Sequence, residues 1–151
     1  MKKYECVERK KEMIVYETQS EKETFEIGHQ LAENSKPGDI YCLLGDLGVG
    51  KTVFSKGFAI GLGITEPITS PTFTIVQVYE AEKSLYHFDM YRIEDEDELE
   101  MIGYEDYFYG KGVCLVEWAN NVEEVIPKNA KWITIEKDLE KGFDYRKITI
   151  K

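Results

Sequence analysis

Glycine, lysine and threonine in the stretch GDLGVGKT, residues 45–52, have the spacing GxxxxGK[ST] of a phosphate-binding loop. Glycines in such a loop let successive backbone amides turn inward toward phosphate oxygens, and a helix that begins at the lysine points its positive dipole end at the same anion. Lys51 can then reach the terminal phosphates, and the hydroxyl of Thr52 can bind Mg²⁺. The alternative is a glycine-rich turn with an incidental lysine, and the flanking elements decide between the two.

The segments on either side of this glycine loop have the periodicity that the motif requires. IYCLL, residues 40–44, is continuously apolar, which is typical of a central strand covered on both faces. TVFSKGFAIGLG, residues 52–63, places apolar side chains at helical spacing, and Gly63 predicts the end of that helix. Strand, loop and helix follow in the required order, which favours the phosphate loop over the incidental turn.

Two acidic residues end predicted strands and are candidates for completing a metal site. Asp89 closes SLYHFD and Glu117 closes VCLVE. Carboxylates at the C-terminal ends of buried strands lie on the edge where the glycine loop emerges, and open α/β sheets bind ligands there. Either residue can hold Mg²⁺, directly or through water, or orient a water for attack. The alternative for each is an ordinary strand-end carboxylate in a hydrogen bond or salt bridge.

Other polar residues near these strands admit two interpretations. The segment TSPT, residues 69–72, is placed like a switch that a terminal phosphate orders, but its residue types suit a polar surface turn equally well. Arg92 can stabilise transition-state charge, or it can pair with the acidic run at residues 94–98. His87 and Trp118, taken singly, are more often packing residues than catalysts.

The rest of the chain alternates strand and helix signals. Residues 13–17 predict a strand, and a capping box follows it, with Ser20 at the N-cap and Glu23 at N3 of a helix. Residues 73–80 and 84–93 predict a hairpin, and the acidic run predicts a helix N-terminus. Residues 130–151 predict a closing hairpin. We therefore predict an α/β fold like that of P-loop NTPases, a three-layer sandwich with a mixed, mostly parallel central sheet and an added antiparallel hairpin.

Composition limits the class of protein and of ligand. A chain of 151 residues without a linker or repeat predicts a single domain over residues 1–151. Nineteen Lys and Arg against 29 Asp and Glu give a net charge of −10, which disfavours nucleic acid as a direct ligand. No apolar run is long enough for a membrane span, and we expect a cytoplasmic protein with no membrane partner. Three cysteines, Cys6, Cys42 and Cys114, have no metal spacing and are expected to be reduced and structural.

The stretches GDLGVGKT, SPTFTIV, YHFDMYR and LVEWA, in this order over nearly the whole chain, strongly resemble the bacterial TsaE family, formerly YjeE. The resemblance implies a small ATPase that uses ATP and Mg²⁺ and is required for making threonylcarbamoyladenosine beside the anticodon of tRNA. It also implies TsaD and TsaB as protein partners, with tRNA engaged only indirectly through their complex.

The resemblance also implies roles for individual residues. Thr52 and Glu117 would be Mg²⁺ ligands, Asp89 would act at the metal or the attacking water, and the segment from Thr18 to Thr24 would lie at the adenine. The catalytic set would be Lys51, Asp89 and Glu117. The phosphates would be held by Leu47, Gly48, Val49, Gly50, Lys51 and Thr52. At position 49 this chain has valine where the family usually has alanine. At position 53 it has valine where the family has a second hydroxyl residue after the lysine. Neither change removes a group that defines the phosphate-binding motif.

Two other classes of function are compatible with the same loop. A phosphotransferase would pass the terminal phosphate to a small metabolite, although little chain remains for a lid or an acceptor domain. A nucleotide-sensing adaptor would bind the nucleotide without turnover.

Overall fold

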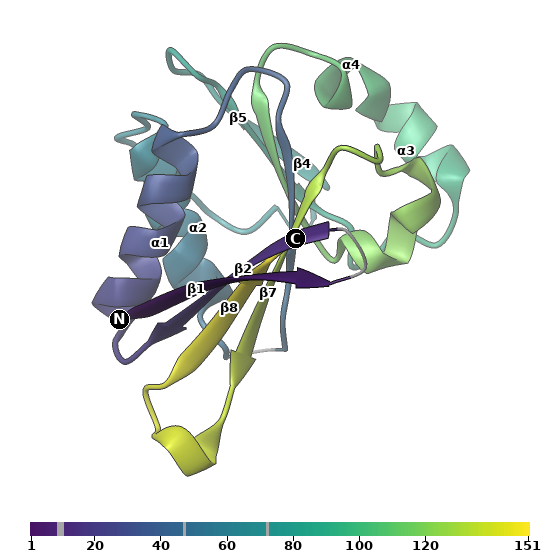
Figure 1. Cartoon of the computed structure of the whole chain (residues 1–151). Helices are drawn as coiled ribbons and strands as arrows, with labels where there is room; N and C mark the ends of the chain where they lie inside the picture. Colours follow the sequence, from purple (N-terminus) through teal and green to yellow (C-terminus); the bar gives the residue numbers. More distant parts are fainter. Residues whose placement is uncertain (9–10, 47, 72) are drawn as a thin grey trace.

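Strand β3 (Ile40–Leu44) leads into the glycine loop and lies near the middle of an eight-stranded sheet in the computed structural model (Figure 1). The structure describes residues 1–8, 11–46, 48–71 and 73–151. Within these residues the strand order is β1-β2-β8-β7-β3-β6-β5-β4. The other strands are β1 (Lys2–Glu8), β2 (Lys11–Thr18), β4 (Val76–Tyr79), β5 (Leu85–Asp89), β6 (Val113–Glu117), β7 (Lys131–Lys137) and β8 (Arg146–Ile150).

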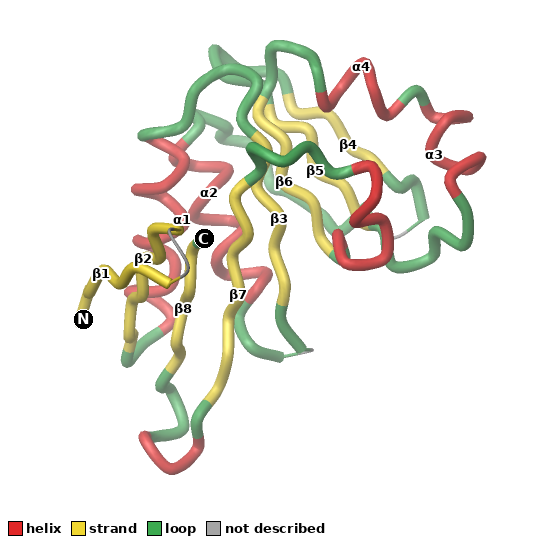
Figure 2. The backbone as a smooth tube through the Cα atoms, turned by 45° about the vertical axis from the view of Figure 1, so that its right-hand side comes forward, coloured by secondary structure: helices red, strands yellow, loops and turns green. Residues whose placement is uncertain are grey.

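The sheet is parallel in its middle and antiparallel toward both sides. β3 pairs in parallel with β6 and with β7, and β5 pairs in parallel with β6. Antiparallel pairs join β1 to β2, β2 to β8, β8 to β7 and β4 to β5 (Figure 2). The predicted mixed sheet is confirmed, and the predicted mostly parallel character holds for its core, where the three parallel pairs lie, while the four outer pairs are antiparallel. The predicted closing hairpin is the pair of β7 and β8.

Helices cover both faces of this sheet. Helices α1 and α2 lie side by side on one face, and α3 and α4 lie on the other, so the predicted three-layer sandwich is confirmed (Figure 1). Two short 3₁₀ segments, η1 and η2, follow β6 and β7. The helical segments are α1 (Glu21–Glu33), α2 (Lys51–Gly61), α3 (Glu96–Ile102), α4 (Tyr104–Phe108), η1 (Ala119–Val125) and η2 (Leu139–Lys141).

The alternation of side chains along β3 divides the interior into two cores. Tyr41 and Leu43 point into the core beneath α1 and α2, whereas Ile40 and Cys42 point into the core beneath α3, α4 and η1. Both sets are buried because helices cover both faces. This arrangement explains why the segment before the glycine loop is continuously apolar.

Glycines allow α1 and α2 to approach closely. A Cβ atom at Gly28 would collide with the backbone carbonyl of Phe54, and one at Gly57 would collide with the backbone carbonyl of Phe25. Any larger residue at either position would force the helices apart. The close approach fixes α2 against α1, and with it the end of α2 that carries the glycine loop.

Local sequence signals set several helix ends. Ser20 Oγ accepts a hydrogen bond from the amide of Glu23 at 3.2 Å, as predicted for the N-cap of α1. In a full capping box the Glu23 carboxylate would accept a hydrogen bond from the amide of Ser20. Here it accepts one from the amide of Gln19 instead. Helix α2 begins at Lys51, and Gly63 follows its C-cap with φ of 89°, as predicted.

Three strands differ from the prediction. β5 ends at Asp89 and not at residue 93, because the chain turns at Tyr91 and Arg92. β4 begins at Val76, not at residue 73, because Ile75 has φ of 67°, a left-handed conformation that a strand cannot contain. β1 was not predicted, since its side chains are mostly exposed and give no alternation of apolar and polar residues. No helix in the described part of the chain has the length and apolar character needed to cross a membrane.

Candidate functional site

The glycine loop occupies the turn between β3 and α2, where its backbone takes conformations that only glycine adopts readily. Gly48 has φ of 77° and Gly50 has φ of 106°. Gly50 is also the N-cap of α2 and has no side chain to satisfy the first amides of the helix. Those amides and the positive end of the helix dipole therefore suit an anion. Leu47 lies outside the described residues.

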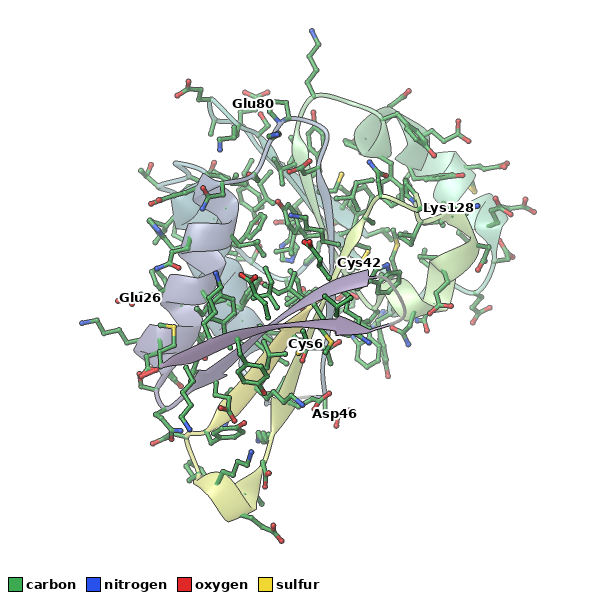
Figure 3. All side chains as sticks on the ribbon, viewed as in Figure 1. Cys6, Glu26, Cys42, Asp46, Glu80 and Lys128 are labelled. Atoms are coloured by element: carbon green, nitrogen blue, oxygen red, sulfur yellow. The ribbon has the colours of Figure 1, made fainter. Side chains whose placement is uncertain are left out.

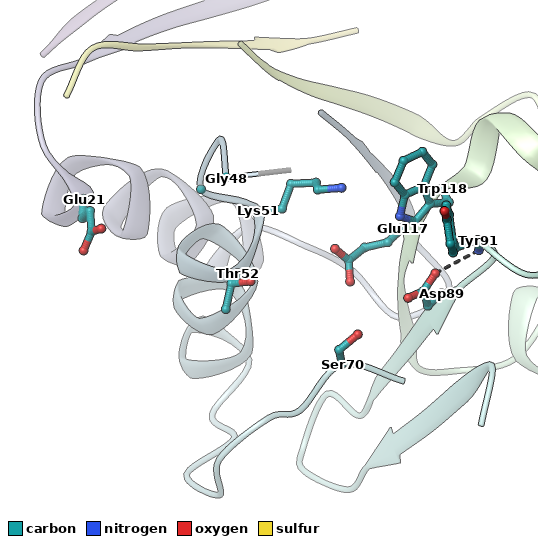
Figure 4. Close-up of a pocket in the computed structure, with 10 residues that line it drawn as sticks. Glu21, Gly48, Lys51, Thr52, Ser70, Asp89, Tyr91, Glu117 and Trp118 are labelled. Carbon is teal, nitrogen blue, oxygen red and sulfur yellow. Dashed lines mark hydrogen bonds between the residues drawn. The ribbon is translucent and has the colours of Figure 1, made fainter. Parts of the chain in front are cut away.

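A cavity of about 560 Å³ opens beside this loop (Figure 4). This volume is in the range of small-molecule sites, roughly 300–1,000 Å³. The loop, α1, the segment before β4, and the ends of β5 and β6 all contribute to its wall. The lining residues are Glu21, Gly48, Gly50, Lys51, Thr52, Ser70, Asp89, Tyr91, Glu117 and Trp118.

The sheet brings the two predicted carboxylates together. Asp89 and Glu117 are directly opposite each other in the parallel pair of β5 and β6, and Glu117 is also opposite Leu43 of β3. Because parallel strands end at the same edge, both carboxylates lie beside the loop that leaves β3. Figure 4 shows Asp89, Glu117 and Lys51 pointing toward the same space.

Hydrogen bonds orient both carboxylates. Oδ1 of Asp89 accepts from the amide of Tyr91 at 2.9 Å, and Oε2 of Glu117 lies 2.9 Å from Nε2 of His87. The side chain of Glu117 is 15% exposed, so it is partly withdrawn from water but still reaches the cavity. The site therefore holds an ammonium, a hydroxyl and two oriented carboxylates around one space.

Lys51 and Thr52 take different positions at the start of α2. The ammonium of Lys51 lies over the ring of Trp118, with Nζ 4.6 Å from the ring centre. The side chain of Thr52 is exposed at the cavity wall. A threonine hydroxyl with two carboxylates is an all-oxygen donor set, which is the chemistry that Mg²⁺ prefers.

Val49 contributes to the loop through its backbone and not through its side chain. Its side chain is buried in the core beneath α1 and α2. Its carbonyl oxygen accepts a hydrogen bond of 2.8 Å from Nε of Arg146 on β8. Sequence reasoning did not identify Arg146, because 97 positions separate the two residues and no motif joins them.

The residues of the segment 69–72, predicted as a possible switch, differ in whether they reach the cavity. Ser70 lines the cavity, whereas the Thr69 hydroxyl and amide bond to Gln77 Oε1 and to the hydroxyl of Tyr79. Thr72 lies outside the described residues, so the switch hypothesis stays a prediction. Arg92 lies over the ring of Phe73, 4.6 Å from its centre, and is not among the described residues that line the cavity.

Two aromatic residues at the cavity were not predicted as site residues. Trp118 and Tyr91 contact each other, with ring centres 4.9 Å apart, and both line the cavity. Each follows a strand-end carboxylate by one or two positions, and this proximity in sequence is the signal that could have identified them. Glu21 also lines the cavity and falls within the segment from Thr18 to Thr24 that the resemblance placed at the adenine.

Comparison with known proteins identifies relatives over most of the chain. A family model described as "Threonylcarbamoyl adenosine biosynthesis protein TsaE" matches residues 18–148. The tRNA threonylcarbamoyladenosine biosynthesis protein TsaE of Bacillus subtilis is 48% identical over 137 residues, which is 90% of this chain and 84% of the relative. The protein of the same name from Treponema pallidum is 39% identical over 118 residues, covering 78% of this chain and 87% of the relative.

A solved structure is similar as well. The crystal structure of YdiB from Bacillus subtilis superposes with a TM-score of 0.78 at 42% sequence identity. The superposition covers 91% of this chain and 84% of the other. The sheet and the helices that build the cavity therefore have a counterpart in an experimentally determined fold.

Proposed function

The chain belongs to the TsaE family, and from this premise we propose that it is a Mg²⁺-dependent ATPase that acts in threonylcarbamoyladenosine biosynthesis on tRNA through TsaD and TsaB. The observation that carries the proposal is the convergence of the glycine loop, Lys51 and the two strand-end carboxylates on one cavity. The relatives named above carry the biosynthetic role in their names. The net charge of −10 also favours contact with tRNA through partner proteins, since an acidic chain repels phosphate.

The glycine loop and Lys51 would bind the triphosphate. Loop amides that point inward donate to phosphate oxygens, and the Lys51 ammonium offsets their charge. The arginine on β8 helps to fix the loop, because Arg146 donates a hydrogen bond to the Val49 carbonyl. Binding therefore rests on a loop whose shape is set before the ligand arrives.

Mg²⁺ would be held by Thr52 and Glu117, with Asp89 at the metal or at the attacking water. The oxygen donors at this cavity fit the ion, since Mg²⁺ is usually bound by one or two carboxylates together with substrate phosphates. Bound there, the ion would neutralise charge that develops on the phosphate oxygens. Asp89 is held by the Tyr91 amide, so its carboxylate is oriented toward the cavity without further rearrangement.

The proposal is tested by measuring ATP hydrolysis while TsaD and TsaB are titrated into the protein. We expect slow hydrolysis alone and a faster rate in the mixture, because small NTPases commonly need a partner to complete the site. A rate that stays constant across the titration contradicts a partner-dependent ATPase. ADP release that accelerates only with an added small metabolite would favour a phosphotransferase instead.

A pair of lysine variants separates site effects from charge effects. Lys51→Ala should weaken ATP binding about ten- to a hundredfold, since hydrogen bonds to charged groups contribute roughly 1.5–3 kcal/mol. Lys56→Ala removes an exposed lysine from the same helix and should leave binding unchanged. In single-turnover experiments with labelled ATP, binding without any ADP formation would identify a nucleotide-sensing adaptor.

A further inference from the structure

His87 connects the two strands that end in the candidate carboxylates. In the parallel pair of β5 and β6, His87 is opposite Leu115 and Asp89 is opposite Glu117, so His87 and Glu117 are diagonal neighbours on one face of the sheet. Nε2 of His87 lies 2.9 Å from Oε2 of Glu117. The histidine is 3% exposed and is not among the described residues that line the cavity, but it contacts Glu117, which is.

The chemistry of this contact indicates which ring nitrogen of His87 carries the hydrogen. An ionised carboxylate only accepts hydrogen bonds, so Nε2 of His87 carries the hydrogen and donates it to Glu117. In the neutral ring Nδ1 is then a buried acceptor, and it has no hydrogen-bond partner within the described part of the chain. An apolar side chain beside Leu85 on this face would avoid burying that unpaired nitrogen. The contact with Glu117 is the polar interaction that offsets the burial of the ring.

We propose that His87 is a positioning residue that holds the Glu117 carboxylate in the orientation needed for Mg²⁺. This inference rests on the function proposed above, in which Glu117 binds the metal. A glutamate has several freely rotating bonds, and a hydrogen bond to one carboxylate oxygen fixes the direction of the other. Groups that orient metal ligands in this way typically change metal affinity or activity 10- to 100-fold, about the range expected here, when they are removed.

The two histidines of the chain provide a matched pair of variants. His29 also contacts a glutamate within α1, with Nδ1 2.9 Å from Oε1 of Glu33, and it is not among the described residues that line the cavity. His87→Leu removes the donor, whereas His87→Gln keeps an N–H that can reach Glu117. His29→Gln makes the same chemical change at a contact that orients no metal ligand.

Calorimetry with ADP, in the presence and absence of Mg²⁺, measures the metal separately from the nucleotide. We expect His87→Leu to weaken the Mg²⁺-dependent part of binding about 10- to 100-fold while ADP alone binds as in the wild type. His87→Gln should recover most of the loss, and His29→Gln should match the wild type. Equal Mg²⁺ dependence in His87→Leu and the wild type would overturn the inference.

A second readout does not depend on nucleotide or activity. Nitrogen NMR of ¹⁵N-histidine-labelled protein, recorded on the neutral imidazole, should show His87 as one tautomer with hydrogen on Nε2. Glu117→Ala should convert this signal to a mixture of tautomers, and it should leave His29 unchanged. A wild-type mixture, or an Nδ1–H tautomer, would overturn the positioning contact.

The two readouts also separate this inference from the function on which it rests. If the wild-type protein binds no nucleotide with Mg²⁺ even when TsaD and TsaB are present, the proposed function fails. If it binds and His87→Leu shows the same Mg²⁺ dependence, only the role of His87 fails. Thermal melting of His87→Leu, compared with the wild type and with His87→Gln, checks that any effect of His87→Leu is not loss of the fold.

Discussion

The ammonium of Lys51 lies 4.6 Å from the centre of the Trp118 ring, so the lysine of the glycine loop makes a cation–π contact across the cavity. Trp118 directly follows β6 and has φ of 57°, a left-handed conformation that costs a non-glycine residue about 1–3 kcal/mol. That conformation presents the ring to Lys51 and Tyr91. The same ammonium that would bind phosphate is thus held by an aromatic face.

Because of this contact, the fluorescence of Trp118 should report whether the Lys51 ammonium lies on its ring. A triphosphate would compete with the ring for the ammonium, and the contact is weak, about 0.5–1 kcal/mol at exposed sites. The chain has two tryptophans, so Trp132→Phe leaves Trp118 as the single tryptophan. In this background, we expect the emission to change when ATP and Mg²⁺ are added.

Lysine variants in the single-tryptophan background provide the control. Lys51→Ala should change the starting emission and remove the response to nucleotide, and Lys56→Ala should do neither. Nucleotide binding detected by calorimetry with no change in Trp118 emission would show that Lys51 stays on the ring.

A second prediction concerns the arginine that fixes the glycine loop. Besides its bond to the Val49 carbonyl, Arg146 donates through Nη1 to the carbonyls of Tyr145 and Phe143, at 2.7 and 3.0 Å. Arg146→Met keeps the aliphatic stem and removes these donors. We expect weaker ATP binding, by up to about tenfold, because a bond from a charged donor contributes roughly 1.5–3 kcal/mol and only part of it bears on the loop.

Binding is measured by calorimetry, and stability is measured by urea unfolding of the same samples. Lys147→Met alters the next position on β8 and should change neither quantity by more than about 0.5 kcal/mol. ATP affinity equal to that of the wild type in Arg146→Met would show that the loop keeps its shape without this bond.

A third prediction tests the packing of α1 on α2. Gly57→Ala places a methyl group against the backbone carbonyl of Phe25, and backbone cannot move aside as a side chain can. We expect the free energy of unfolding to fall by about 1–3 kcal/mol, the usual cost of overpacking. Urea denaturation followed by circular dichroism measures it. Ile60→Ala, at a side chain on the same helix that is 51% exposed, should change stability by less than about 0.5 kcal/mol.

The packing prediction fails if Gly57→Ala unfolds at the same urea concentration as the wild type. That result would mean that the two helices can separate without loss of stability. It would also remove the argument that close packing fixes the position of the glycine loop.

A fourth prediction concerns the thiols. Cys42 and Cys114 are buried on neighbouring central strands, and burial raises the pKa of each thiol to about 12. Cys6 is partly exposed on the edge strand β1 (Figure 3). A raised pKa keeps a thiol protonated until the pH approaches that value, so at pH 8 only about one thiolate in 10⁴ forms at the buried positions.

We therefore expect a thiol reagent to modify one cysteine of the native protein at mildly alkaline pH and all three in denaturant. Cys6→Ser should make the native protein unreactive. Rapid modification of more than one thiol in the native state would show that the central strands are accessible to solvent.

Local sequence patterns determined the parts of this protein that depend on near neighbours. The glycine loop follows from the GxxxxGK[ST] spacing between a continuously apolar strand and an amphipathic helix, because those elements form from residues adjacent in the chain. The sequence also predicted that Asp89 and Glu117 lie at one edge of the sheet beside the glycine loop, because each ends a parallel strand. Signals of this kind do not need the rest of the fold.

Strand order and register decided everything that joins distant segments. Arg146 reaches Val49 only because β8 pairs with β7 and β7 pairs with β3. His87 meets Glu117 because β5 and β6 are parallel and in one register, and Lys51 meets Trp118 because β6 ends beside the start of α2. A periodic pattern states which face of a strand is buried but not which strand lies next to it, so these contacts exist only in the folded chain.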